Sequence, residues 1–68
     1  MDDEIENLVL SILAKVDNLD TLEIAKLAFG PRATQKMINP MLYKMLKDGT
    51  LEKIVEEGVA RPRWKLTG

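Results

Sequence analysis

The spacing of apolar residues changes once along this chain of 68 residues, and the change falls at Gly49. Before Gly49, apolar residues recur every three or four positions, as they do on an amphipathic helix. After it, residues 63–67 alternate between polar and apolar side chains, as a half-buried strand does. Because two strands are not stable alone in water, the C-terminal hairpin must pack on the preceding helices. A chain this short forms one domain, which we predict to be α+β.

The first two helices are predicted from their apolar spacing and their end signals. The first has an acidic start, which opposes the positive end of the helix dipole, and it ends near residue 17. A short extended stretch around residues 18–20 leads to the second helix, which begins at a capping box of Asp20 and Glu23 and closes at Gly30. The single apolar stripe predicted for the first helix consists of Ile5, Leu8, Val9, Ile12, Leu13 and Val16.

The third helix is predicted over residues 34–47, with Gly49 closing it, and it has two different faces. The face expected to lie in the core carries Ile38, Met41, Leu42, Met45 and Leu46. The opposite face has bases, amides and one aromatic residue but no acid, and it carries Lys36, Asn39, Pro40, Tyr43, Lys44 and Lys47.

Pro40 leaves two starting points open for this helix. Inside a helix, a proline removes one hydrogen bond and costs about 3 kcal/mol. In the alternative, Asn39 is the N-cap and Pro40 the first helical residue, and the Asn39 side chain then caps the helix instead of meeting a ligand. We favour the longer helix because Ile38 already joins the apolar stripe.

The order of elements indicates the fold. After Gly49 come a short strand at residues 51–55, a turn at residues 56–58 and a second strand on which Trp64 and Leu66 share one face. Three helices followed by a hairpin make a winged helix-turn-helix, with three helices packed on a small antiparallel β-hairpin wing.

Composition argues against catalysis and against membranes. The chain has no Cys and no His, and its acids lie at helix starts and at the hairpin tip. We therefore expect no enzyme activity, no metal or other cofactor and no small-molecule substrate. No apolar run approaches the ~18 residues of a membrane span, so we expect no membrane partner and an intracellular protein, cytoplasmic, nuclear or both.

Charge is divided unevenly along the chain although the net charge is only −1. Residues 1–25 carry a net charge of −6, and residues 26–68 carry +5. A phosphate near the third helix and the hairpin would therefore meet a positive local field.

Asn39 and Tyr43 lie on one face of the third helix because they are four residues apart. An amide bonds phosphate oxygens, and an exposed ring offers its π-face to a base or a sugar. Trp64 is expected beside Tyr43 with its indole N–H directed outward. The alternative for Trp64 is a core residue that pins the hairpin to the helices.

At these residues the sequence resembles the Zα domain family. The resemblance extends from Ile5 to Thr67 and is most specific in residues 38–43 and 61–64. It implies one winged-helix domain over residues 1–68 that recognises left-handed Z-form DNA and RNA by their zigzag backbone and syn purines. Such domains occur in double-stranded-RNA adenosine deaminases, in interferon-induced nucleic-acid sensors and kinases, and in viral proteins that counter those sensors.

The resemblance also implies a role for individual residues. Tyr43 would contact the syn guanine, Trp64 would brace that ring and reach a phosphate, and Asn39 would bond the backbone. Lys36 would bind a phosphate, and Pro62 would pack on the wing strand. The complete predicted interface consists of Lys36, Asn39, Tyr43, Lys44, Arg61, Pro62, Arg63 and Trp64.

The sequence departs from the family pattern at several positions. Gln35 stands where a second lysine is usual, and Pro40 stands where a phosphate-contacting residue is common. Ala60 and Arg61 replace the usual Thr-Pro, and Arg61 and Arg63 are expected to restore positive charge from the wing.

Two other functions stay open at this point. A generic winged helix would place its third helix in the major groove of B-form DNA. A degenerate winged helix would serve protein–protein interaction, with weak self-association included.

Overall fold

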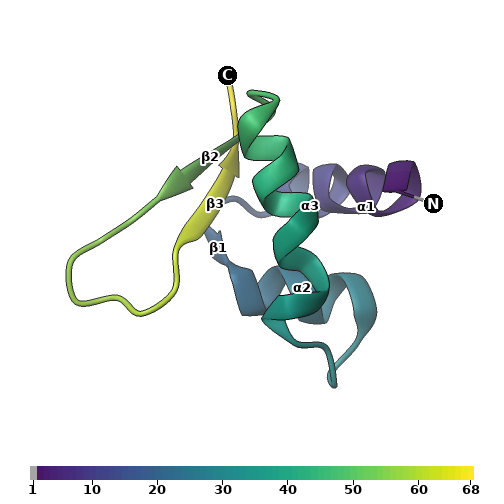
Figure 1. Ribbon diagram of the computed structural model, residues 1–68, viewed down its shortest axis with the longest axis horizontal. Coiled ribbons are helices and arrows are strands. Elements are labelled where there is room, and N and C mark those ends of the chain that lie inside the picture. The colour runs from purple at the N-terminus through teal and green to yellow at the C-terminus, as the bar shows by residue number, and fades with distance from the viewer. Residues whose placement is uncertain (1) are drawn as a thin grey trace.

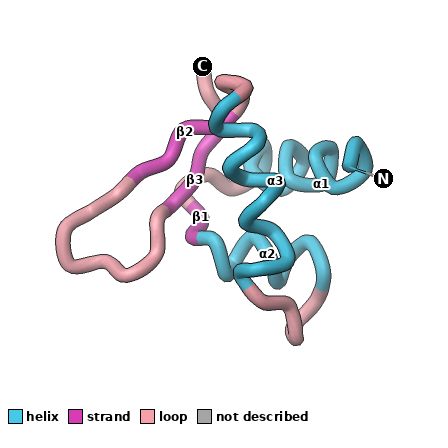
Figure 2. Tube along the Cα trace, viewed as in Figure 1, coloured by secondary structure: helices cyan, strands magenta, loops and turns pink. Residues whose placement is uncertain are grey.

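The computed structural model describes residues 2–68, in which three helices and a three-stranded antiparallel sheet form an α+β winged helix, as predicted. In Figure 1, α3 crosses in front of α1, and the loop between β2 and β3 extends away from the helices. Figure 2 shows that this loop is the long irregular segment of the wing. The elements are α1 (Asp2–Lys15), β1 (Leu19–Asp20), α2 (Thr21–Phe29), α3 (Gln35–Lys47), β2 (Leu51–Ile54) and β3 (Arg63–Leu66).

The central strand of the sheet is β3, because the strand order is β1-β3-β2. Both pairings are antiparallel, and Trp64 lies opposite Leu19 on one side and Lys53 on the other. The extended stretch predicted between the first two helices is confirmed as β1. The wing is therefore a hairpin with a short third strand that ties it to the connection between α1 and α2.

Local signals in the sequence explain where the helices begin and end. The predicted capping box is confirmed, because the N–H of Glu23 donates to Asp20 Oδ1 at 2.8 Å and the N–H of Asp20 donates to Glu23 Oε1 at 3.0 Å. After α3, Gly49 has a φ of 82°, which suits a glycine. Two hydrogen bonds, Gly49 N–H to Leu46 O and Thr50 N–H to Met45 O, then close the helix as a Schellman motif.

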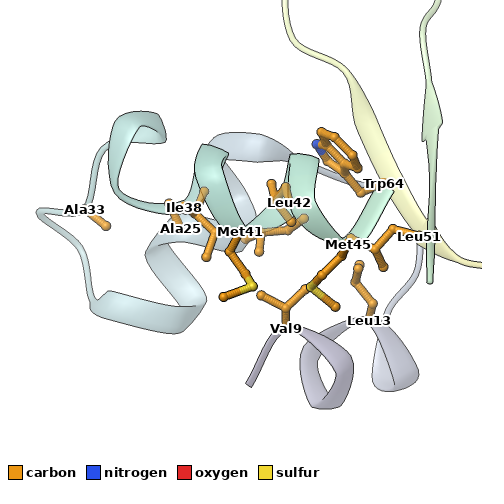
Figure 3. Packing of buried hydrophobic residues seen from close by; sticks show 11 residues of the cluster. Val9, Leu13, Ala25, Ala33, Ile38, Met41, Leu42, Met45, Leu51 and Trp64 are labelled. Atoms are coloured by element: carbon orange, nitrogen blue, oxygen red, sulfur yellow. The ribbon is translucent and has the colours of Figure 1, made fainter. Parts of the chain in front are cut away.

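The core lies between α3, α1, α2 and the sheet (Figure 3). The face of α3 predicted to be buried is confirmed, with Leu46 partly buried at its end. The apolar stripe predicted for α1 is buried only in part, since Val9 and Leu13 lie in the core while Leu8 is 38% and Val16 is 53% exposed. The helix lies at the outside of the domain and packs along one narrow line, so the second row of its apolar residues stays at the surface.

None of the helices in residues 2–68 has the length and apolar character needed to cross a bilayer.

Candidate nucleic-acid interface

The longer of the two predicted third helices is confirmed. Thr34 is the N-cap residue and α3 begins at Gln35, so Asn39 and Pro40 both lie inside the helix. No hydrogen bond within residues 2–68 uses the half-buried Asn39 side chain, which leaves its amide available to a ligand. Tyr43 follows one turn later and is 44% exposed.

Tyr43 is held from behind by Trp64. The two rings are perpendicular, with an interplanar angle of 88° and centroids 5.4 Å apart, which is a favourable edge-to-face geometry. Trp64 itself is 0% exposed, and its indole N–H donates to Thr21 Oγ1 at 2.9 Å. The prediction of an outward N–H is therefore wrong. A buried donor needs a partner, and the buried hydroxyl at the start of α2 provides it.

The alternative reading of Trp64 as a core residue is thus correct, together with its predicted contact to Tyr43. Trp64 joins β3 to α2 by its hydrogen bond to Thr21. Its ring also packs edge-to-face against the exposed ring of Tyr43 on α3. In this structure no surface of Trp64 is available to a phosphate. Its influence on a ligand must pass through Tyr43.

Lys53 on β2 is a contact of Tyr43 that the sequence analysis missed. Its Nζ donates to Tyr43 Oη at 2.9 Å and lies 4.9 Å from the ring centroid. Lys53 is opposite Trp64 in the register of the hairpin, so the two side chains leave the same face of the sheet. The pairing of Lys53 with Trp64 is the only feature that could have identified Lys53 from the sequence. That pairing depends on the strand register, which residues 55–62 set.

Lys44 does not belong to an acid-free face as predicted. Its Nζ lies 3.2 Å from Glu6 Oε1 on α1 and 3.5 Å from Asp48 Oδ2. The hydrogen bond to Glu6, and then the charges of Glu6 and Asp48, raise the pKa of Lys44 above its usual value. The charge of Lys44 is therefore offset by two carboxylates.

Arg61 and Arg63 are directed to the β1 side of the sheet. Arg61 Nε lies 3.5 Å from Asp20 Oδ2, which makes an ion pair by distance, although this buried nitrogen has no partner in hydrogen-bond geometry. Arg63 Nη1 donates to the carbonyl oxygen of Asn18 at 2.8 Å. Pro62 lies half-buried between them. A carboxylate thus offsets the charge of Arg61, whereas Arg63 is held on the β1 side by an uncharged carbonyl.

Lys36 is different, because it is exposed in the first turn of α3 and no ion pair in the described part of the chain includes it. That turn carries no acid, whereas the first turn of α2 carries Glu23. The positive end of the α3 dipole and the lysine therefore act in the same direction on a nearby anion.

Four side chains thus form a connected set, which we call the aromatic series. Thr21 on α2 bonds Trp64 on β3, Trp64 contacts Tyr43 on α3, and Tyr43 accepts a hydrogen bond from Lys53 on β2. The series runs from the core to the surface and presents a fixed aromatic ring with a cation at its end. This arrangement suits a ligand that has both flat, apolar groups and phosphates.

The family model described as the adenosine deaminase z-alpha domain matches residues 1–68. No curated protein and no solved structure matches the chain.

Proposed function

The chain belongs to the adenosine deaminase z-alpha domain family, and from this membership we propose that it binds left-handed Z-form DNA or RNA by backbone shape, with Tyr43 against a syn purine. The family supports Z-form nucleic-acid binding in general, and the finer contacts are our proposal. One observation carries it: Tyr43 is 44% exposed yet fixed from behind by Trp64. A ring that is already held in place loses little conformational entropy when it meets a ligand.

The proposed contacts divide into direct and supporting ones. Lys36 and Asn39 meet the phosphate backbone directly, with Tyr43 beside them on α3 and Pro62 at the base of the wing. Trp64 supports Tyr43 and does not touch the ligand. We assign Lys44 and Arg61 to the fold because carboxylates offset their charges, and Arg63 because it is half-buried and hydrogen-bonded to the Asn18 carbonyl.

The proposed mechanism is selective stabilisation without catalysis. A domain that binds only the left-handed form shifts a right-handed duplex toward it by mass action. Since the contacts fall on a backbone shape that both nucleic acids adopt, DNA and RNA are both ligands. We propose an intracellular module, cytoplasmic or nuclear, of a nucleic-acid sensor, an RNA-editing enzyme or a viral antagonist.

Circular dichroism of an alternating CG duplex tests this function. Titration with the domain is expected to invert the long-wavelength bands, and Tyr43→Ala is expected to abolish the inversion at equal concentration. Lys26→Met, on the exposed surface of α2, is the control and should behave as the parent. A duplex that stays right-handed at saturating protein contradicts the proposal, as does protection of one defined B-form sequence that survives Tyr43→Ala.

Protein association has one observation in its favour as a second function. An open groove of about 310 Å³ lies between α1 and α2, lined by Leu8, Ser11, Ile12, Lys15, Val16 and Leu27. Leu27 is 60% exposed there. Sedimentation over a concentration series checks this function: Leu27→Lys should weaken any self-association, and a strictly monomeric parent argues against it.

A further inference from the structure

We propose that Lys53 is a phosphate-binding residue of the interface, held at the hydroxyl end of Tyr43 so that one ligand meets the ring and the ammonium together. The inference rests on the proposed function and extends the interface from α3 onto β2. It starts from two distances, 2.9 Å from Lys53 Nζ to Tyr43 Oη and 4.9 Å from Nζ to the ring centroid.

These two distances show that the ammonium lies beyond the hydroxyl and not above the ring. A cation centred over a ring is necessarily closer to the centroid than to the hydroxyl oxygen. Here the order is reversed, so Lys53 does not cover the ring face in the way that a cation–π contact would. The ring is left for a base or a sugar, and the cation stands at its end.

The charge of Lys53 is not neutralised by its partner. A phenol oxygen is uncharged, and it occupies one of the three N–H donors of the ammonium. Lys53 is exposed, and no ion pair in residues 2–68 includes it. Lys44, one residue after Tyr43, lies against two carboxylates instead. Of these two lysines, Lys53 is therefore the one with donors and charge to offer a phosphate.

The strand keeps nearby acid away from Lys53. Glu52 precedes it on β2 and so leaves the opposite face of the sheet, where it lies across from Lys65. Lys53 lies across from Trp64, which also contacts Tyr43. The same indole thus fixes the ring, and the ring fixes the position of the ammonium.

Salt dependence separates a phosphate contact from a residue that only orients Tyr43. Each phosphate neutralised by a protein cation releases counterions, and log K falls with log [salt] by a slope of about 0.9 per contact. A residue that merely holds the ring changes the affinity at every salt concentration equally. Removal of a phosphate contact changes the slope.

The experiment is fluorescence anisotropy with a CG duplex whose 8-bromoguanines favour the syn form, so that the Z form exists before protein is added. Parent, Lys53→Met, Lys53→Arg and Lys65→Met are titrated between 50 and 200 mM salt. Lys65→Met is the matched control, because it removes the same charge from the same hairpin on the opposite sheet face. Thermal unfolding of each variant shows that the fold is intact.

Over that fourfold range of salt, the parent should lose about 3.5-fold more affinity than Lys53→Met. Lys53→Arg should recover the slope of the parent, and Lys65→Met should keep it. The inference is overturned if Lys53→Met binds with the slope of the parent, or if Lys65→Met lowers the slope equally. A parent that does not bind the Z-form duplex at 50 mM salt overturns the proposed function itself, and this inference with it.

Discussion

The two flanks of β3 use their cations differently. On the β1 flank, Arg61 faces the Asp20 carboxylate and Arg63 bonds the Asn18 carbonyl. On the β2 flank, Lys53 bonds an uncharged phenol. On the first flank, a carboxylate offsets the charge of Arg61, and the half-buried Arg63 holds the wing to the connection between α1 and α2. On the second flank, Lys53 is exposed and has no carboxylate partner within residues 2–68, so its charge remains available to a phosphate. A count of bases treats the three residues alike, but the partner and the burial of each side chain differ among them.

Ion pairs within the fold also change how much of the uneven charge along the chain a ligand meets. The net charge of +5 on residues 26–68 overstates what a ligand meets, because acids from the first 25 residues fold back onto it. Glu6 reaches Lys44 and Asp20 reaches Arg61. The positive field is therefore narrower than the sequence indicates, and on α3 and β2 the exposed lysines outside the ion pairs of residues 2–68 are Lys36, Lys47 and Lys53.

The largest expected effect is that of Trp64→Ala, which removes the residue shared by both flanks. Loss of a fully buried indole should lower the free energy of unfolding by about 3–5 kcal/mol. Urea denaturation followed by far-ultraviolet circular dichroism measures this. If the variant retained the stability of the parent within about 1 kcal/mol, β3 would not be held by Trp64.

Tyr43→Ala should weaken Z-form binding by about 5- to 160-fold, since stacking of one base contributes about 1–3 kcal/mol. It should lower stability less than Trp64→Ala does, because the Tyr43 ring is 44% exposed. On the β2 flank, this change removes only the ring that is proposed to contact the ligand. Phe29→Ala is the control, because Phe29 on α2 is similarly exposed, at 37% against 44%. Equal losses of affinity in the two variants would argue against a specific role for Tyr43.

Thr21→Val tests the inner end of the aromatic series. It keeps the shape of the side chain but leaves the buried Trp64 N–H without an acceptor, which should lower stability by about 1–3 kcal/mol. Thr21→Ser retains the hydroxyl and should lose less. Thermal unfolding of both variants checks the order, and a more stable Thr21→Val would show that the hydrogen bond does not support the fold.

Arg63→Met tests whether the cations of the β1 and β2 flanks differ in binding phosphate. Stability should fall by about 1 kcal/mol because the bond to the Asn18 carbonyl is lost. The salt slope of Z-form binding should stay that of the parent, unlike the slope of Lys53→Met. A lower slope in Arg63→Met would place a phosphate on the β1 flank and remove the distinction.

The smallest effect concerns Lys44. Because Glu6 and Asp48 raise its pKa, the stability gained from these pairs is present below pH 10.5 and is lost as pH rises through the raised pKa. The difference in melting temperature between the parent and Lys44→Met should therefore shrink in this alkaline range. A difference that stays constant across it would mean that the pairs do not stabilise the fold.

Local signals predicted the fold well, whereas the site depended on distant pairings. The capping box at Asp20, the buried face of α3 and the closing Gly49 each follow from a few neighbouring residues. Two errors at the site concern partners far apart in sequence: Lys44 and Glu6 are 38 residues apart, and Trp64 and Thr21 are 43 apart. Nothing local in the sequence specifies which distant group satisfies a given donor.

The same long-range pairing explains why Lys53 was missed. Its position beside Tyr43 requires Trp64 opposite it in the hairpin, and residues 55–62 of the connecting loop contain no sequence pattern from which this register can be predicted.

For α1, the spacing of the apolar residues does not indicate how many of them the rest of the domain buries. Leu8 and Val16 therefore carried the same signal as the buried Val9.

Trp64 also gives the domain its own optical reporter. It is the sole tryptophan of the chain, Tyr43 is the sole tyrosine, and the two rings are in contact. A buried indole whose N–H is bonded inside the protein emits at short wavelength, and a tyrosine this close transfers its excitation to it. Occupation of Tyr43 by a ligand should therefore be visible in the emission of the unlabelled protein, excited at the absorbance of tyrosine.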